Sequence, residues 1–214
     1  MSELWERIVG VNLQTETIDQ NGPLASLTCK EEILVATVSF YLNRYSWDDS
    51  KQMVQEAYIE ADSSMKPLYG TVLLHGVLET LSTLRHNGFK LAIASTDTRK
   101  RMEESFKALK IDTFFDAIVG GDDVENGKPA PDMILKAAEQ TRSKLEETII
   151  VGDSVNDMKM GKNAGVKACI GVLTSGGTRE KLGPFADIIV DSITELNVRI
   201  HKSGSPGRQI GESK

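Results

Sequence analysis

The chain lacks the features that mark disulfide-stapled, membrane-spanning and secreted proteins. Its 214 residues include only two cysteines, Cys29 and Cys169, which lie far apart without the spacing of metal ligands. We therefore expect both to be reduced, structural thiols. No run of about 18 apolar residues occurs, and the opening MSELWERIVG is amphipathic and mixed in charge rather than a signal peptide. These absences predict a cytoplasmic protein with no membrane partner.

Basic charge is also scarce. The 25 Lys and Arg residues are outnumbered by 31 Asp and Glu residues, which gives a formal net charge of −6. Because no basic stretch offsets this balance, we expect no nucleic-acid partner and no anionic membrane surface. A small anionic substrate remains possible, since local charge in a cleft can oppose the overall sign.

From about residue 89 onward, short β-rich runs alternate with helical patterns. The predicted strands are FKLAIAS, FFDAIVG, ETIIVGD, VKACIGV and ADIIVD, and the helices between the first three are TRKRMEESFKAL and APDMILKAAEQT, with NDMKMGKNAG following the third. Continuous apolar strands separated by helices are typical of a parallel sheet covered on both faces. The fold class is therefore α/β, with a doubly wound parallel sheet.

The rest of the chain has a different pattern of residues. Residues 1–66 place apolar side chains at helical spacing in EEILVATVSFYLNRY and SKQMVQEAYIEA, with no convincing buried strand. We predict a small α-helical subdomain over 1–66, an α/β core over 67–200 and a disordered tail over 201–214, where Gly, Ser and charge occur without periodicity.

Candidate functional residues follow three of the predicted strands. Ligands of an open parallel sheet bind beyond the carboxyl ends of its strands. Ser95 and Thr96 follow the first strand, where hydroxyls can donate to a phosphate oxygen, although an ordinary helix cap is the alternative. Lys128, in GKPAPD, is held between Gly127 and Pro129 as a point charge for a phosphoryl group, unless it is merely a solvated loop lysine.

The third position is VGDSVND, where Asp153 directly follows a strand and Asp157 lies one helical turn later. Carboxylate oxygens at a strand end suit Mg²⁺, which keeps several waters and bridges to substrate phosphate. The alternative is that Asp153 only caps the helix and Asp157 is solvated. The acidic GGDD run, Gly120 to Asp123, is interpreted as the loop that leads to Lys128, although its acids could add charge at the mouth of the cleft.

Taken together, LAIAST, GKPAPD and VGDSVNDMKMGKNAG resemble motifs II, III and IV of the haloacid dehalogenase (HAD) superfamily. Residues 68–197 are similar to its phosphoglycolate phosphatase-like branch, and the helical N-terminal part resembles that branch's cap. The resemblance implies a Rossmann-like core and a Mg²⁺-dependent hydrolase of a small phosphorylated metabolite, acting through an aspartyl-phosphate.

The resemblance also implies a role for each matching residue. Ser95, with Thr96, would bind the transferring phosphoryl group, and Lys128 would neutralise it together with the nucleophile. Asp153 would bind Mg²⁺, and Asp157 would orient the lysine or the metal shell. Phosphoryl transfer depends mostly on positioning and charge stabilisation, so each of these residues would act by holding oxygens in place.

One motif departs from the family pattern. The Asp-x-Asp-Gly run of motif I, which supplies the nucleophile on a central strand between LAIAS and TIIVGD, does not occur in the sequence. Asp19 and Asn21 in IDQNGPL imitate it only superficially, because the preceding VNLQTET is too polar for a buried strand. We expect WERIVG to continue a cap helix, the sequence to be truncated before Met1, and the chain to be unstable and inactive alone.

Three other functions are compatible with parts of the pattern. A catalytically inactive HAD-like fragment serving as a binding or regulatory module would explain the missing nucleophile. A dehalogenase is disfavoured because Asp153 would be a metal ligand, which metal-free dehalogenation does not need. A sugar-phosphate mutase is disfavoured by Asp157.

Overall fold

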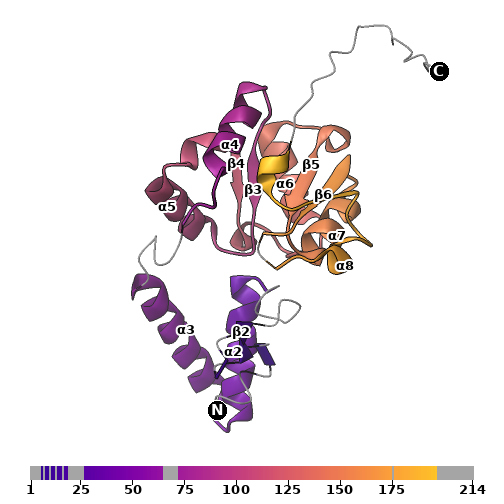
Figure 1. Ribbon diagram of the computed structural model, residues 1–214. Coiled ribbons are helices and arrows are strands. Elements are labelled where there is room, and N and C mark those ends of the chain that lie inside the picture. Colours follow the sequence, from indigo (N-terminus) through magenta and orange to yellow (C-terminus); the bar gives the residue numbers. More distant parts are fainter. Residues whose placement is uncertain are drawn as a thin grey trace, which may run out of the picture.

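The computed structural model describes residues 27–64, 72–174 and 176–196, together with individual positions between residues 6 and 18 (Figure 1). Asp19, Asn21 and the predicted tail over 201–214 lie outside the described residues. None of the helices in the described part is both long and apolar enough to cross a membrane.

Two long helices dominate the N-terminal part. α2 (Cys29–Leu42) and α3 (Trp47–Ser64) pack against each other below the rest of the molecule in Figure 1. They cover the two segments whose spacing predicts helices.

The first 66 residues also hold a short strand pair that the sequence pattern did not indicate. β1 (Val11–Asn12) and β2 (Thr17–Ile18) form a two-residue antiparallel pair. The Asn12 side chain accepts hydrogen bonds from the backbone N–H groups of Gln14 and Thr15, each at 3.0 Å. This local turn chemistry needs no buried apolar strand, so the hydrophobic pattern could not reveal it.

The α/β part confirms the predicted parallel strands. β3 (Ala92–Ala94) pairs with β4 (Ala117–Val119), and β5 (Ile149–Gly152) pairs with β6 (Ala168–Val172), which pairs with β7 (Ile188–Val190). All three pairings are parallel. We call β3–β4 the first half-sheet and β5–β6–β7 the second half-sheet.

Helices connect these strands in the alternating order that the sequence predicts. The α-helices are α4 (Val77–His86), α5 (Arg99–Leu109), α6 (Asp132–Thr141), α7 (Val155–Ala164) and α8 (Arg179–Leu182). Short 3₁₀ turns are η2 (Asp112–Phe114), η3 (Gly121–Asp123), η4 (Leu145–Glu147) and η5 (Ile193–Glu195). α6 packs against the first half-sheet, α7 packs against the second, and the two helices touch each other.

A single apolar cluster joins the two half-sheets. Its fully buried members include Val119 of β4, Met133 of α6 and Met160 of α7. Ala94 of β3 and Ile150 of β5 pack against the same cluster. The half-sheets therefore share one core through α6 and α7, rather than through hydrogen bonds between their strands.

Between the half-sheets, the hydrogen-bonded ladder is interrupted. Among the described strands, β3 pairs only with β4 and β5 pairs only with β6. Each therefore has an edge without a described strand neighbour, at the position where the family resemblance places the motif I strand. On β5, the side chains of Ile149 and Val151 are 44% and 38% exposed, which is unusual for an inner strand of a parallel sheet.

Candidate active site

An ion pair brings two of the predicted site residues together. The Lys128 Nζ atom lies 2.7 Å from Asp157 Oδ1, although the residues are 29 positions apart in the chain. Their side chains are only 15% and 10% exposed. Lys128 is therefore not a solvated loop lysine, and Asp157 is not a solvated helix residue.

Local hydrogen bonds fix the Asp157 carboxylate. Ser154 caps α7, and its N–H and hydroxyl groups donate to Asp157 Oδ2 at 3.2 and 2.7 Å, while Asp157 N–H donates back to Ser154 Oγ. This reciprocal pattern is a capping box. One carboxylate oxygen thus secures the helix start and the other holds Lys128.

The glycine before Asp153 is required by this packing. A Cβ atom added to Gly152 would lie 2.5 Å from Asp157 Cβ, closer than side chains can approach. Gly152 therefore lets the end of β5 pass close to the carboxylate that holds Lys128.

Asp153 follows β5 directly and is partly buried. Ser154, rather than Asp153, provides the helix cap, so the capping alternative for Asp153 is not observed. Its carboxylate makes no hydrogen bond or ion pair with any other residue that the structure describes. A partly buried carboxylate without a protein partner at a strand end is chemically suited to a hard divalent cation.

Ser95 and Thr96 lie at the end of β3, in the first half-sheet. Ser95 N–H donates to the Val119 carbonyl at 3.1 Å, and Ser95 Oγ accepts from Asp97 N–H at 3.3 Å. Thr98, rather than Ser95 or Thr96, caps α5. Within the described residues, neither Ser95 nor Thr96 hydrogen-bonds to Lys128 or to the two aspartates, so the half-sheets contribute to the site separately.

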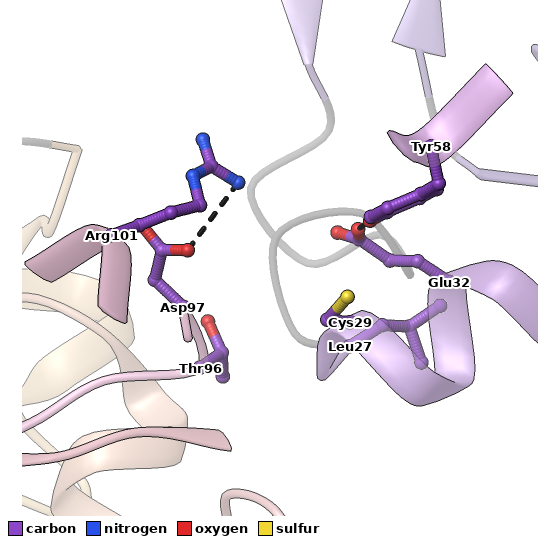
Figure 2. A pocket seen from close by; sticks show the side chains of 7 residues that line it. All are labelled: Leu27, Cys29, Glu32, Tyr58, Thr96, Asp97 and Arg101. Carbon is purple, nitrogen blue, oxygen red and sulfur yellow. Dashed lines mark hydrogen bonds and ion pairs between the residues drawn. The ribbon is translucent and has the colours of Figure 1, made fainter. Parts of the chain in front are cut away.

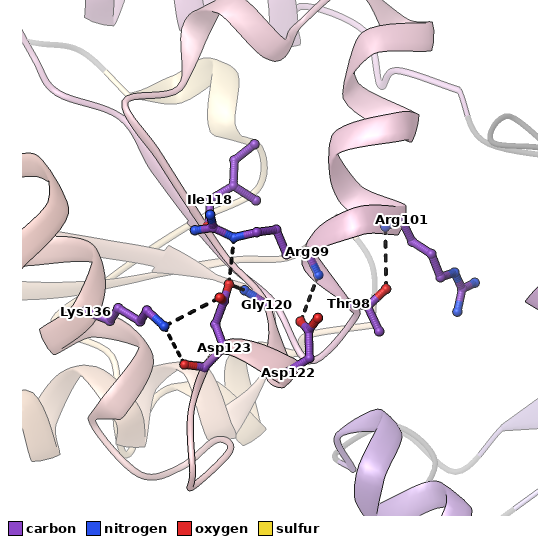
Figure 3. A network of polar contacts seen from close by, with 8 residues as sticks. All are labelled: Thr98, Arg99, Arg101, Ile118, Gly120, Asp122, Asp123 and Lys136. Carbon is purple, nitrogen blue, oxygen red and sulfur yellow. Dashed lines mark hydrogen bonds and ion pairs between the residues drawn. The ribbon is translucent and has the colours of Figure 1, made fainter. Parts of the chain in front are cut away.

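A polar network, drawn in Figure 3, anchors the loop that leads from β4 to Lys128. Asp123 Oδ2 accepts from Arg99 Nε and from Gly120 N–H, each at 2.9 Å, and its carboxylate also lies near Lys136. Asp122 Oδ1 accepts from Arg99 N–H at 2.8 Å. The acids of the GGDD run thus hold the loop instead of adding free charge to the cleft mouth.

The Asp123 carboxyl titrates below the ordinary range. Burial acts to raise its pKa, but the Gly120 hydrogen bond and the Arg99 guanidinium outweigh burial and lower the pKa overall. The carboxylate therefore stays charged, and keeps its cationic partners, at all but strongly acidic pH.

The start of α2 rests directly on this loop. Thr28 is 6% exposed, and its N–H and hydroxyl groups both donate to Glu31 Oε2 at 2.7 Å. A Cβ atom on Gly127 would lie 2.7 Å from Thr28 Cγ2, and one on Gly121 would lie 3.1 Å from it. The glycine next to Lys128 therefore makes room for the helical part of the molecule.

A cavity of about 190 Å³ lies between the helical part and the α/β part. Figure 2 shows three residues of the α/β part, Thr96, Asp97 and Arg101, on one side of the cavity. Facing them from the helical side are Leu27, Cys29, Glu32 and Tyr58. Thr96 thus joins the cavity to the end of β3, where the sequence predicts phosphate binding.

Sequence reasoning missed most of the residues that line this cavity. Cys29, treated there as a structural thiol, is free and lines the cavity, whereas Cys169 is free and fully buried as expected. Burial is the main cause that raises the pKa of the Cys29 thiol, so this side chain lines the cavity as an uncharged thiol. Glu32 and Tyr58 come from different helices, and a helical pattern alone does not indicate which polar residues face a partner element.

No metal-binding cluster of three or more His, Cys, Asp or Glu side chains occurs among the described residues. Mg²⁺ is usually held by one or two carboxylates together with substrate phosphate and water. The single carboxylate of Asp153 therefore fits such an ion as part of its ligand set.

These features agree with a comparison to known protein families. The model of the haloacid dehalogenase-like hydrolase family matches residues 30–171. The chain belongs to this family. The matched span contains Ser95, Lys128 and Asp153, so the HAD motifs expected from the sequence lie within it.

Relatives and solved structures agree with this membership. Pyrophosphatase PpaX from Halalkalibacterium halodurans is 50% identical over 95 residues, 44% of this chain and 44% of that protein. Pyrophosphatase PpaX from Bacillus mycoides is 38% identical over 120 residues, 56% of each chain. The HAD chain thus spans about half the length of the curated relatives it matches.

The fold extends further than these sequence matches. The crystal structure of CbbY from Rhodobacter sphaeroides in complex with phosphate superposes with a TM-score of 0.61 at 22% identity, covering 91% of this chain and 89% of that one. At this identity the likeness shows the fold alone, and it includes both the helical and the α/β part.

Proposed function

We propose that this HAD chain holds the phosphoryl group and the Mg²⁺ ion of a phosphomonoester hydrolase acting on a small phosphorylated metabolite. The observation that carries the proposal is the buried Lys128–Asp157 ion pair at the carboxyl end of β5. It holds the Lys128 ammonium at the carboxyl end of β5, the strand that Asp153 follows, where this cation would offset the negative charge of a bound phosphoryl group.

Each residue has a defined part in this proposal. Lys128 Nζ retains hydrogens for phosphoryl oxygens, because Asp157 uses only one of its donors. Ser95 and Thr96 would donate hydroxyl groups to the same phosphoryl group from the end of β3. Asp153 would hold Mg²⁺, which supplies charge neutralisation for the transferring phosphoryl group.

The attacking carboxylate is the remaining requirement. The sequence holds no Asp-x-Asp-Gly run, and no described strand pairs with the free edges of β3 and β5. We therefore propose that the 214 residues bind substrate and metal without turning substrate over, and that the nucleophile of the active enzyme occupies the strand position between the half-sheets. Substrate capture without turnover would also suit a binding module.

A hydrolysis assay tests this proposal. With p-nitrophenyl phosphate and Mg²⁺, the purified chain should release p-nitrophenol no faster than buffer, because the Asp-x-Asp-Gly run that would supply the attacking carboxylate does not occur in the sequence. Turnover that requires Mg²⁺ and is lost in Asp153→Asn would contradict the proposed inactivity. Asp19 would then be the candidate nucleophile, and the variant Asp19→Asn would test that role.

A further inference from the structure

The cavity between the helical part and the α/β part has a chemical character that selects among phosphate esters. Resting on the proposed function, we infer that it takes a neutral, hydroxyl-bearing leaving group, such as that of a polyol or sugar phosphate, and disfavours a carboxylate-bearing one. The cavity adjoins Thr96, so a group attached to a phosphoryl bound at Ser95 and Thr96 would extend into it.

The charges around the cavity are unequal. Glu32 and Asp97 are carboxylates in its lining, and Arg101 is the only cation among the described residues that line it. Arg101 is already engaged by two acids, Asp97 at 3.4 Å and Asp62 at 3.8 Å. The guanidinium charge is therefore offset before any ligand arrives.

Glu32 carries the excess negative charge. It accepts a hydrogen bond from the Tyr58 hydroxyl, which is neutral, and it forms no ion pair with a cation in the part of the chain that the structure describes. Burial and the neighbouring Glu32 carboxylate raise the pKa of Tyr58, so the phenol remains a protonated donor. A ligand carboxylate near Glu32 would meet a carboxylate that has no cationic partner among the described residues, while the Arg101 guanidinium already faces Asp97 and Asp62.

A hydroxyl group meets no such conflict. It donates one hydrogen bond and accepts two, so it can donate to Glu32 or Asp97 and accept from the Arg101 guanidinium. The mixture of donors and acceptors in the lining therefore suits hydroxyl groups. The small apolar contribution of Leu27 and Cys29 leaves room for the carbon skeleton that carries them.

Two esters that differ in one group test the inference. Glycerol 3-phosphate and 3-phosphoglycerate share a phosphate, a secondary hydroxyl and a chain length, and differ in a terminal hydroxymethyl or carboxylate group. We expect the full chain in Mg²⁺ to bind glycerol 3-phosphate about tenfold more tightly by isothermal titration. In Glu32→Gln, which removes the charge and keeps a hydrogen-bond acceptor for Tyr58, the preference should fall below about threefold.

The matched control is Glu60→Gln, which removes the same charge from an exposed position of α3 and should leave the preference unchanged. Equal affinity for the two esters, or a preference that Glu32→Gln and Glu60→Gln alter equally, would overturn the inference. Inorganic phosphate separates this failure from that of the proposed function. Phosphate binding with no ester preference refutes the cavity inference alone, whereas a chain that binds neither phosphate nor ester refutes both.

Discussion

The two half-sheets differ in how completely their apolar side chains are buried. In the first, Ala117 and Val119 of β4 are 6% and 0% exposed, whereas in the second Ile149, Val151 and Ile188 are 44%, 38% and 54% exposed. Both present apolar side chains to α6 or α7, but the second half-sheet leaves large apolar side chains uncovered, whereas the exposed strand residue of the first is the small Ala92. Burial is therefore complete where α6 and α7 meet, and incomplete both on β5, beside the interruption, and on β7, at the other edge of the second half-sheet.

This difference shows what holds the site together. The residues expected to bind phosphate and metal stand on strands that share no described ladder. Their relative position depends on the shared core beneath α6 and α7 and on the Lys128–Asp157 ion pair. Two of the candidate site residues, Lys128 and Asp157, are thus also part of the structural connection between the half-sheets.

The largest effect should come from breaking that connection. Lys128→Met leaves the Asp157 carboxylate buried without its cation, so we expect the free energy of unfolding to fall by about 3 kcal/mol. Urea denaturation measures it. The control Lys144→Met removes an ion pair with Glu147 in which both side chains are more than 60% exposed, and it should cost less than about 1 kcal/mol. Equal losses would show that the buried pair does not connect the half-sheets.

Matched valines compare the two half-sheets directly. Val119→Ala removes two buried methyl groups from the core, so the free energy of unfolding should fall by about 2 kcal/mol. Val151→Ala makes the same change on β5, where the side chain is 38% exposed, and should cost about 0.5 kcal/mol. A loss at Val151 as large as that at Val119 would mean that β5 is covered in solution.

The loop network should give a smaller loss than Lys128→Met or Val119→Ala, and a distinct pH signature. Asp123→Asn weakens the contacts with Arg99 and Lys136, with an expected loss of about 1 kcal/mol at neutral pH. Because folding lowers the pKa of Asp123, its contribution is present above the ordinary value of 3.8 and disappears as pH falls through the lower folded pKa. The wild-type and variant stabilities should therefore converge below about pH 4.

Thermal unfolding monitored across that pH range provides the measurement, with the exposed Asp48→Asn as control. A difference between wild type and Asp123→Asn that stayed constant down to pH 2 would contradict the lowered pKa.

The sequence predicted the regular part of this molecule well because its signals are local and strong. Each apolar run between residues 89 and 191 became a parallel strand, and the helices between them begin within a few residues of the expected positions. The Lys128–Asp157 contact depends on long-range geometry, and the family resemblance implied it as one of two roles for Asp157, the other being in the metal shell. Strand ends converge on one edge of a parallel sheet whatever the intervening sequence.

Other features lacked a local signal. The Asn12 turn depends on a polar side chain that caps its own backbone, and the GGDD acids act through Arg99, which lies more than 20 residues earlier. The cavity lining depends on how α2 and α3 face α5, which hydrophobic spacing within one helix does not encode. Thr28 shows the same limit, because its contact with Gly127 arises only when the two parts of the molecule meet.

The most direct test of the central claim is whether Mg²⁺ controls phosphate binding through Asp153. Titration of inorganic phosphate into the full chain should give an affinity about tenfold higher with Mg²⁺ than with a chelator present. Asp153→Asn should remove that difference while circular dichroism and thermal unfolding remain close to wild type. A phosphate affinity that is the same with and without Mg²⁺, or a Mg²⁺ effect that persists in Asp153→Asn, would contradict the proposed site.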